Sequence, residues 1–434
     1  MPETVCLCNS TIAWGGGEKW HLDAALSLAA RGWRVLLLCH PDGALFARAP
    51  KDTANLEVVP IAIGRLSFLN PLFRKRLTDF FRKERPRAVI MNLAADLKAA
   101  GLAAKAAGVR HIVFRRGLAL PVRDSVFNRY LYSRVITRFI ANSQATLDMA
   151  LANNPALIPK ERTTVLFNGI DAGFFDAELL RCAETLKAAS MSGASGDDRL
   201  VGLAAMRMAS GGMLGRPLVI GNAGRLNVQK GQHLLLHLVK CLTDKGQDVR
   251  LVIAGEGERE EELKNLAQSL GIEDKVLFTG FMADLSCFWQ AIDVFVLSSF
   301  WEGFGFVLLE AMLAQKPIMA FAVSNIPELI TNGENGYLFP LPQGEETTVP
   351  EAIVAAAERE SAAAPAEREP VHGMASEKNR AGQDGTFPEN MAEVLMRLAG
   401  EPDRACAMGS AGRSFALAQF SQDASMDRLE GLLR

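Results

Sequence analysis

The sequence of 434 residues has no apolar run that approaches the ~20 residues needed by a membrane-spanning helix. Its first ten residues, MPETVCLCNS, lack the basic region and the long apolar region of a secretory signal, so we expect no signal peptide. Hydrophobic content of 49% and charged content of 22% are ordinary for a soluble globular enzyme. A chain of this length exceeds what one core supports, so we expect two domains or slightly more.

Cysteines are few, and none is paired at a spacing typical of zinc ligands. Cys6 and Cys8 are two residues apart, which would place both on one face of a strand. Scattered cysteines of this kind are typical of reduced core residues in a cytosolic protein, and we expect that state here. The seven are Cys6, Cys8, Cys39, Cys182, Cys241, Cys287 and Cys406.

The small net charge of −2 conceals an asymmetry between the two halves. Residues 1–170 contain 24 basic and 12 acidic residues, whereas residues 171–434 contain 23 basic and 37 acidic residues. Two interpretations remain open. The oppositely charged halves could simply attract each other, or the basic half could suit an anionic acceptor or an acidic membrane surface.

The stretch 291–321 shows the clearest local pattern. Residues 293–297 (DVFVL) read as a buried parallel strand, residues 298–303 as a loop, and a helix then begins near Gly305 or Phe306. The sequence IMAF at 318–321 returns as the next strand. A glycine-containing loop between strand and helix exposes main-chain N–H groups at the helix start, so we expect an anion to bind there.

Two glutamates bracket this predicted anion site. Either one alone would suit a capping or salt-bridged residue. Together, in Glu302-Gly-Phe-Gly-Phe-Val-Leu-Leu-Glu310, they resemble the Glu-x7-Glu signature of retaining glycosyltransferases of family 4. The resemblance implies that Glu302 lies against the donor sugar and that Glu310 holds the ribose hydroxyls. It also implies donor contacts from the residues between them, namely Phe304, Gly305, Phe306 and Val307.

A second motif contains two cations around a strand-to-helix turn. Arg225 and Lys230, in GRLNVQKG, could be two surface cations or could point at one anion. The segment resembles the Gly-Arg-x4-Lys-Gly motif of the same family, which implies that both bind the donor diphosphate. The resemblance further implies that the loops at Glu256 and Phe281 surround the base and ribose.

The first half contains a glycine cluster, Gly15, Gly16 and Gly17, between a predicted strand and helix. It lacks the G-x-G-x-x-G spacing of a dinucleotide site, and could form a tight turn or a phosphate cradle. It resembles the family's amino-terminal loop, which approaches the donor phosphates from the opposite domain. Where many relatives carry a histidine, this chain has Arg115 and Arg116, so we expect one of them to meet an anionic acceptor group.

Residues 72–85 predict an amphipathic helix with a basic outer face. It could be an ordinary solvated helix, or it could dock, through about residues 72–87, on acidic lipid or an anionic glycan. Residues 342–385 are poor in large apolar residues, and residues 185–216 are rich in Ala, Ser, Gly and Met. We expect both segments to be loosely ordered excursions.

These patterns predict an α/β fold with two doubly wound Rossmann-like domains facing a cleft, the glycosyltransferase B architecture. We expect an amino-terminal acceptor-side domain at 1–167, a nucleotide-sugar domain at 168–413, and a helix crossing back at 414–434. The resemblance implies metal-independent, retaining transfer from a nucleotide sugar to a glycan or lipid-linked acceptor, in lipopolysaccharide or envelope polysaccharide synthesis. No Asp-x-Asp metal motif is evident at a strand end, and we expect no cofactor and no nucleic-acid partner.

Two other functions remain open for the same architecture. A nucleotide-sugar epimerase would need no acceptor, and a degenerate protein could bind the sugar nucleotide without catalysis. We expect the protein to be cytoplasmic, with the membrane contact described above as its peripheral association.

Overall fold

The computed structural model describes residues 2–192, 199–210, 216–342 and 387–434, and divides them into two compact units. Unit 1 contains residues 2–169 and 422–434, and unit 2 contains the described residues from 170 to 421. The structure divides the chain after Gly169, whereas we expected the boundary after residue 167. The carboxyl-terminal return differs, because residues 414–421 belong to unit 2. The predicted excursion 342–385 lies, apart from Pro342 at its start, outside the described residues.

Unit 1 is built on a seven-stranded parallel sheet in the order β3-β2-β1-β4-β5-β6-β7. Its central strands are almost wholly buried, which explains their continuous apolar sequences. The strands are β1 (Thr4–Asn9), β2 (Arg34–Cys39), β3 (Leu56–Pro60), β4 (Ala88–Met91), β5 (His111–Arg116), β6 (Arg138–Ala141) and β7 (Thr163–Val165).

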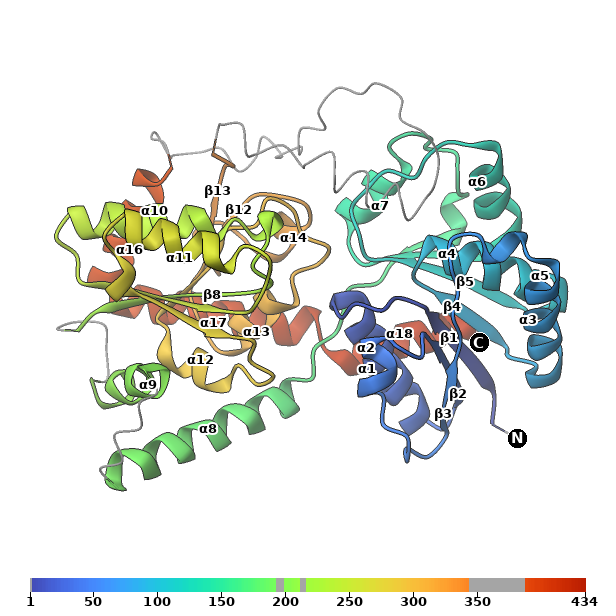
Figure 1. The fold of residues 1–434 in the computed structure, drawn as a ribbon, viewed down its shortest axis with the longest axis horizontal. Helices are drawn as coiled ribbons and strands as arrows, with labels where there is room; N and C mark the ends of the chain where they lie inside the picture. The colour runs from blue at the N-terminus through green and yellow to red at the C-terminus, as the bar shows by residue number, and fades with distance from the viewer. Residues whose placement is uncertain (1, 193–198, 211–215, 343–386) are drawn as a thin grey trace. The chain divides into compact units, whose positions relative to one another are not determined.

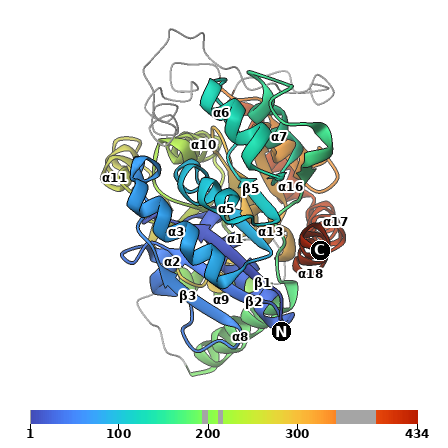
Figure 2. The ribbon, with the colours of Figure 1, turned by 90° about the vertical axis from the view of Figure 1, so that its right-hand side faces the viewer.

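Helices cover both faces of this sheet (Figure 1). α1 (Gly16–Ala30) and α2 (Ala44–Arg48) lie on one side, and α3 (Pro71–Glu84) and α5 (Leu102–Ala107) lie on the other. Figure 2 views the molecule from that second side and shows α3 and α5 in front of the strands. The remaining helical segments are η1 (Ser67–Leu69), α4 (Ala94–Asp96), η2 (Leu97–Gly101), α6 (Val126–Tyr130), η3 (Leu131–Val135), α7 (Gln144–Leu151), η4 (Lys160–Arg162) and α18 (Gln422–Leu433).

Unit 2 has a parallel sheet in the order β10-β9-β8-β11-β12-β13. The strands are β8 (Leu218–Ala223), β9 (Val249–Ala254), β10 (Val276–Gly280), β11 (Val294–Leu297), β12 (Ile318–Phe321) and β13 (Tyr337–Phe339). In Figure 1, α10 (Gln232–Asp244) and α11 (Glu260–Ser269) lie on one side of this sheet, and α12 (Ser286–Ala291) and α13 (Phe306–Leu313) on the other. Further segments are η5 (Val228–Lys230), η6 (Glu273–Lys275), α14 (Ile326–Leu329), α16 (Glu389–Gly400) and α17 (Pro402–Gln419).

The expected excursion at 185–216 is wrong for its described residues, most of which are helical. α8 (Ala172–Ser192) and α9 (Arg199–Ser210) occupy this part of the chain, and both pack against α12. Alanine, leucine and methionine have high helix propensity, so the composition that we interpreted as irregular favours a helix once one face can pack.

The expectation that all cysteines are reduced is also wrong. The structure records a disulfide between Cys182 of α8 and Cys287 of α12, whose Cα atoms are 5.9 Å apart. The two residues are 105 positions apart in sequence, so no spacing pattern could reveal the pair before the two helices were packed. Cys6, Cys8 and Cys39 are buried and free, as expected of core cysteines. Within the described part of the chain, no helix combines the length and apolarity required to cross a membrane.

Candidate active site

The predicted motifs of unit 2 meet at the carboxyl ends of β8 and β11. At this pair of strands the strand order of the sheet reverses direction. β8 and β11 are hydrogen-bonded neighbours, although the chain proceeds from β8 toward β9 and from β11 toward β12 on opposite sides. Loops that leave the carboxyl ends of two such strands diverge and leave a crevice between them, which is where open α/β sheets bind ligands. The Arg225–Lys230 loop follows β8 and the loop containing Glu302 follows β11.

Main-chain and side-chain hydrogen bonds join these two loops into one structure. The amide of Phe300 donates to the carbonyl of Gln229 (2.8 Å), and the Gln229 side-chain amide donates to the carbonyl of Trp301 (2.9 Å). The Ser298 hydroxyl donates to the Lys230 carbonyl (2.7 Å). Movement of one loop is therefore transmitted to the other.

Gly231 makes this close approach sterically feasible. It begins α10 with φ of 59°, and a Cβ at this position would lie 2.3 Å from the carbonyl oxygen of Ser298. Both the left-handed conformation and the contact distance favour glycine. The glycine at the end of the Gly-Arg-x4-Lys-Gly pattern therefore connects the two loops.

Lys230 and Glu302 form an ion pair between the loops, with Nζ and Oε1 2.6 Å apart. Their side chains are 17% and 5% exposed, so this pair is largely shielded from water. The Ser299 hydroxyl also donates to Glu302 Oε1 (2.6 Å), and the Glu302 amide donates to the Ser324 hydroxyl (3.1 Å). Glu302 is thus held by charge and hydrogen bonds in one orientation at the crevice.

Arg225 lies on the same loop as Lys230 but contacts a different carboxylate. Its side chain is 68% exposed and pairs with Glu258, Nη2 to Oε2, at 3.1 Å. Its carbonyl accepts a hydrogen bond from the Gln232 side chain (3.1 Å), which fixes the main chain of the loop. An exposed guanidinium can leave its ion pair and turn toward a ligand with little loss of free energy, because a surface ion pair contributes less than about 1 kcal/mol to stability.

α13 begins at Phe306, with Gly305 as its N-cap at φ of 81°. Glu310 lies in the second turn of this helix and is partly buried. The Phe304 ring packs against Phe306 (5.8 Å between centroids) and Phe420 (6.0 Å), so its side chain belongs to the core of unit 2. A donor contact from Phe304 remains a prediction, and its main chain would have to supply it because the ring packs inward.

Glu256 and Phe281 lie together at the carboxyl ends of β9 and β10. Glu256 Oε1 accepts a hydrogen bond from the amide of Phe281 (3.2 Å), and the Phe281 ring is exposed. Gly255 approaches the main chain of Gly224 so closely that a Cβ would lie 2.0 Å from the Gly224 carbonyl oxygen. The structure thus brings the ends of β8, β9 and β10 together, with Glu256 and Phe281 at their margin.

The glycine cluster of unit 1 lies at the carboxyl end of β1 and at the start of α1. A Cβ on Gly17 would lie 2.7 Å from the side-chain nitrogen of Asn92, so the helix start packs directly on the end of β4. Glu18, in the first turn of α1, accepts a hydrogen bond from the Asn9 side chain (3.0 Å) and is buried. Asn9, the last residue of β1, and Glu18 were not among the predicted site residues.

Arg115 does not face an acceptor, and this part of the prediction is wrong. Its side chain is 1% exposed and donates to Asn92 Oδ1 (3.0 Å) and Asn168 Oδ1 (2.5 Å) while lying 4.1 Å from the centre of the Trp20 ring. Burial lowers the pKa of the guanidinium to about 9, and nearby Glu18 opposes that shift. Arg115 therefore organises the interior of unit 1.

Arg116 points the other way along the pleat and is only partly buried. Its Nη2 donates to the carbonyl of Leu120 at 2.7 Å, which closes the loop after β5. An acceptor contact from Arg116 remains a prediction, because the loop position allows it and no ligand is bound.

A buried carboxylate that the sequence analysis missed is Asp96, just after β4. Ser10 donates to it twice, from its hydroxyl to Oδ1 (2.5 Å) and from its amide to Oδ2 (3.2 Å). Burial raises the pKa of Asp96 to about 6, and the two Ser10 hydrogen bonds oppose the shift. The available signal was a single carboxylate, Asp96, five residues after the apolar run that ends at Met91.

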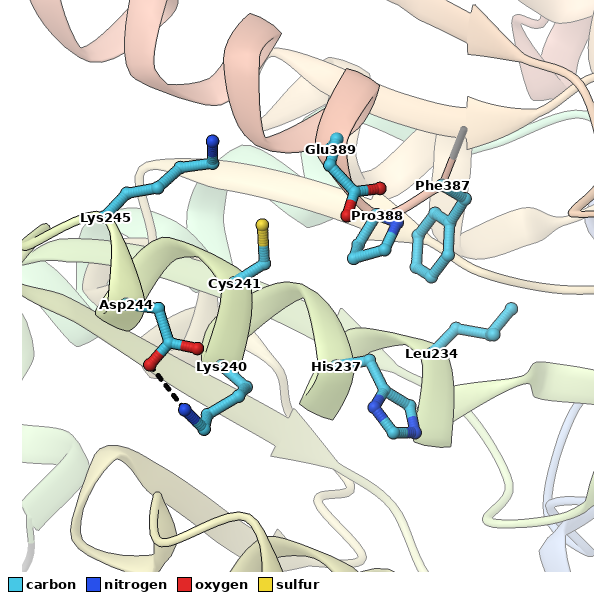
Figure 3. A pocket seen from close by; sticks show the side chains of 9 residues that line it. All are labelled: Leu234, His237, Lys240, Cys241, Asp244, Lys245, Phe387, Pro388 and Glu389. Carbon is cyan, nitrogen blue, oxygen red and sulfur yellow. Dashed lines mark hydrogen bonds and ion pairs between the residues drawn. The ribbon is translucent and has the colours of Figure 1, made fainter. Parts of the chain in front are cut away.

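One cavity of about 550 Å³ lies elsewhere in unit 2, between α10 and the start of α16 (Figure 3). Its lining includes His237, Lys240 and Lys245 of the α10 side and Glu389 of the α16 side, and Lys240 is paired with Asp244. None of the predicted donor-binding residues lines this cavity. We therefore place the candidate active site at the β8 and β11 loops.

Two family profiles match the chain. The profile described as glycosyl transferases group 1 matches residues 209–358, and the profile described as glycosyltransferase family 4 matches residues 14–174. An uncharacterized glycosyltransferase of Haemophilus influenzae is 40% identical over 118 residues, which is 27% of this chain and 33% of that protein. The lipopolysaccharide core biosynthesis mannosyltransferase LpsB of Rhizobium meliloti is 34% identical over 119 residues, 26% of this chain and 34% of that protein.

These curated relatives are matched over only about a third of their own length. A solved structure is similar over almost the full chain. The crystal structure of Anabaena HepE in complex with UDP and glucose has a TM-score of 0.69, with 20% sequence identity and 99% of each chain covered. At that identity the similarity establishes the fold, which is the glycosyltransferase B architecture.

Proposed function

Because this chain belongs to the group 1 and family 4 glycosyltransferases, we propose that it moves a sugar from a nucleotide-diphosphate donor to a glycan or lipid-linked acceptor. The observation that carries the proposal is the shielded Lys230–Glu302 pair, which joins two strand-end loops at the point where the sheet order reverses. A fixed cation and a fixed carboxylate at such a crevice suit the two ends of a sugar-to-phosphate bond.

The electrostatics of bond breakage explain the proposed roles. As the bond to the anomeric carbon lengthens, negative charge grows on the departing diphosphate and positive charge on the sugar ring. Lys230, Arg225 and the positive end of the α13 dipole offset the first charge. Glu302 lies on the sugar side and Glu310 holds the ribose, with Gly305, Phe306 and Val307 supplying donor contacts at the helix start.

We further propose that transfer retains the anomeric configuration and needs no metal ion. The acceptor hydroxyl attacks on the face that the diphosphate leaves, and the departing phosphate oxygen takes the hydroxyl proton. A new bond between sugar and acceptor oxygen forms as the bond between sugar and phosphate breaks. Lys230, together with Arg225 turned toward the ligand, then neutralises the leaving group in place of a divalent ion.

Relatives indicate which substrates to test first. The complex of HepE with UDP and glucose makes uridine diphosphate sugars the first donors, and guanosine and adenosine diphosphate sugars follow. The name of LpsB favours acceptors of lipopolysaccharide or another envelope polysaccharide. In a thermal-shift screen, the donor class that binds will raise the melting temperature selectively, because a ligand that binds only the folded state stabilises it.

Substitution of the two cations tests the catalytic assignment. We expect Lys230→Ala to lower kcat/KM by about 100- to 1,000-fold, because removal of one charge-stabilising donor has an effect of this size. Arg225→Ala should lower it by a similar order. Arg250→Ala is the matched control for Arg225, since Arg250 also forms a surface pair in unit 2, with Asp248 at 2.9 Å. Full activity in both Lys230→Ala and Arg225→Ala would refute the assignment.

Product analysis separates transfer from the alternatives. Transfer yields free nucleoside diphosphate and an extended glycan, whereas an epimerase yields an isomerised sugar nucleotide without any acceptor. Binding of the donor without either product would leave a non-catalytic sugar-nucleotide-binding protein.

A further inference from the structure

Unit 1 has a cluster of large apolar side chains on its surface, formed by two segments far apart in sequence. η1 and the first turn of α3 supply one part, and α6 supplies the other. The Phe68 and Phe127 rings stack with centroids 5.5 Å apart, which places the two segments in contact. The exposed members, between 37% and 85% accessible, are Leu66, Leu69, Leu72, Val126, Phe127 and Tyr130.

Basic side chains surround this apolar cluster. The same segments contribute exposed Arg65, Arg74, Lys75, Arg76, Arg123 and Arg129. Residues 65–79 and 123–130 contain two acidic residues, Asp79 and Asp124, which pair with Lys75 (2.6 Å) and Arg129 (2.6 Å). Arg65, Arg74 and Arg76 have no ion-pair partner within the described part of the chain. Lys98 and Lys105 extend the positive region inward, over the Phe68 and Tyr130 rings (5.9 and 5.3 Å).

The position of the cluster within unit 1 is informative. The segment that bears Leu66 and Leu69 leaves the carboxyl end of β3, and the segment that bears Val126 leaves the carboxyl end of β5. The first of these passes the end of β1, where the Ser10 hydroxyl donates to the carbonyl of Ile63 (3.4 Å). Because all strands of the sheet are parallel, the cluster lies at the same edge as Gly15–Gly17.

We propose that this surface, Leu66–Arg76 together with Arg123–Tyr130, docks on an anionic lipid bilayer. Exposed leucine, valine and aromatic side chains enter the boundary between headgroups and acyl chains, while the surrounding arginines bind anionic headgroups. A protein partner of ordinary surface composition would not match a patch with such an excess of positive charge. Docking brings the carboxyl edge of the unit 1 sheet to the bilayer, where a lipid-linked acceptor would be held.

This surface differs from the one predicted by sequence alone. The outer face of residues 72–87 was the expected contact, but several cations in its second half are engaged within unit 1. Arg82 pairs with Asp79 and donates to the carbonyl of Ala106, and Arg87 pairs with Glu3 and donates to the carbonyl of Leu433. The start of α3, with η1 and α6, carries both the apolar side chains and the unpaired arginines.

Cosedimentation of the full-length protein with vesicles tests the proposal. We expect vesicles of phosphatidylcholine with about 30% phosphatidylglycerol to bind the protein at least about tenfold more tightly than pure phosphatidylcholine, with binding weakened by added salt. Leu69→Glu and Arg76→Glu should each weaken binding about tenfold, since each removes an inserted or attracting group and adds a repelled charge.

Two matched variants serve as controls. Leu180→Glu alters a leucine of α8 that is 66% exposed, against 63% for Leu69, and Lys160→Glu reverses an exposed cation outside the cluster. Both should bind vesicles like the unchanged protein. Absence of wild-type binding to anionic vesicles at low salt, or equal losses in the controls, would overturn the proposal. The proposal would also be overturned if the apolar cluster joined two copies of the chain. The protein would then be a dimer that Leu69→Glu dissociates, and it would not bind vesicles.

The measurement is independent of the proposed chemistry. None of the altered residues lies at the β8 and β11 loops, so the thermal shift produced by a donor should be the same in all four variants. Failure of docking with intact donor binding would overturn the membrane surface alone, and failure of donor binding with intact docking would overturn the proposed function alone.

Discussion

The charged side chains buried at strand ends have different kinds of partner in the two units. In unit 2, Lys230 and Glu302 satisfy each other at 2.6 Å, so each offsets the desolvation of its partner. In unit 1, Arg115 is held by neutral amides and an indole ring, and Asp96 by a serine. The first arrangement can exchange partners with an ionic ligand, whereas the second is enclosed in the interior of unit 1.

Asp96 provides a test of the buried carboxylate at the residue scale. Its folded-state pKa of about 6 lies above its ordinary value of 3.8, so the folded protein holds the proton more tightly than the unfolded chain. Between about pH 4 and pH 6 this group therefore lowers the free energy of unfolding as pH rises, by up to about 3 kcal/mol. We expect Asp96→Asn to lack that decrease, measured by urea unfolding at several pH values.

Asp124→Asn is the control for this measurement. Hydrogen bonds from Arg129 and Asn154 lower the pKa of partly buried Asp124 to about 2, so above about pH 5 this group is ionised in both the folded and the unfolded protein. Its replacement should leave the pH dependence above pH 5 unchanged. Parallel pH profiles for Asp96→Asn and the unchanged protein would contradict the assignment of Asp96.

At the scale of elements, the connection between the start of α10 and the end of β11 depends on one glycine. Gly231 and Gly271 both have positive φ, at 59° and 65°, but only Gly231 faces a carbonyl oxygen within 4 Å. We expect Gly271→Ala to cost about 1–2 kcal/mol from backbone strain alone. Gly231→Ala should cost clearly more and should also weaken donor binding, because Ser298 and the loop that bears Glu302 must move.

Chemical denaturation and donor titration together decide this prediction. If the two alanine variants have equal free energies of unfolding and equal donor affinities, the close contact between the loops has no functional consequence. A loss of donor affinity in Gly271→Ala would also count against it, since Gly271 lies at the end of α11 away from the two loops.

Elements with a strong local pattern were predictable, and those that depend on distant partners were not. Helix α10 begins directly after a glycine, and strand β11 coincides with an apolar run, so a local signal marks each element in the sequence. α8 and α9 were missed because no clear start or stop signal marks them in the sequence. Their packing partner, α12, also lies about a hundred residues away. The contact between η1 and α6 was not predictable for the same reason, since Phe68 meets Phe127 only in the folded chain.

At the scale of the whole molecule, unit 1 is completed by the last helix of the chain. α18 buries Leu429 and Leu433, and Glu430 accepts a hydrogen bond from the Trp33 indole (3.0 Å). Deletion of residues 422–434 should lower the stability of unit 1 by roughly 3–6 kcal/mol, because two leucine side chains lose their buried environment. Urea unfolding followed by tryptophan fluorescence should show an earlier transition.

A paired substitution separates packing from charge in this helix. Asp423 and Asp427 pair with Arg31 but are exposed, so replacing both by alanine should cost less than about 1 kcal/mol per pair. Equal destabilisation by the deletion and by this double substitution would show that charge, not burial, attaches α18. An unchanged unfolding transition in the deletion variant would show that unit 1 does not need the helix.

Local pattern predicted two doubly wound halves, and the resemblance to family 4 identified the motif loops of unit 2. Apolar runs, glycines and paired charges within about ten residues indicate strands, turns and anion sites. The residues that form each of these features lie close together in the sequence. The identity of each partner depended on the folded chain. Lys230 meets Glu302 across 72 positions, Cys182 meets Cys287 across 105, and Arg115 turns inward onto Asn168. Such pairings arise from strand order and helix packing, which bring distant residues together and leave no spacing that a linear pattern could contain.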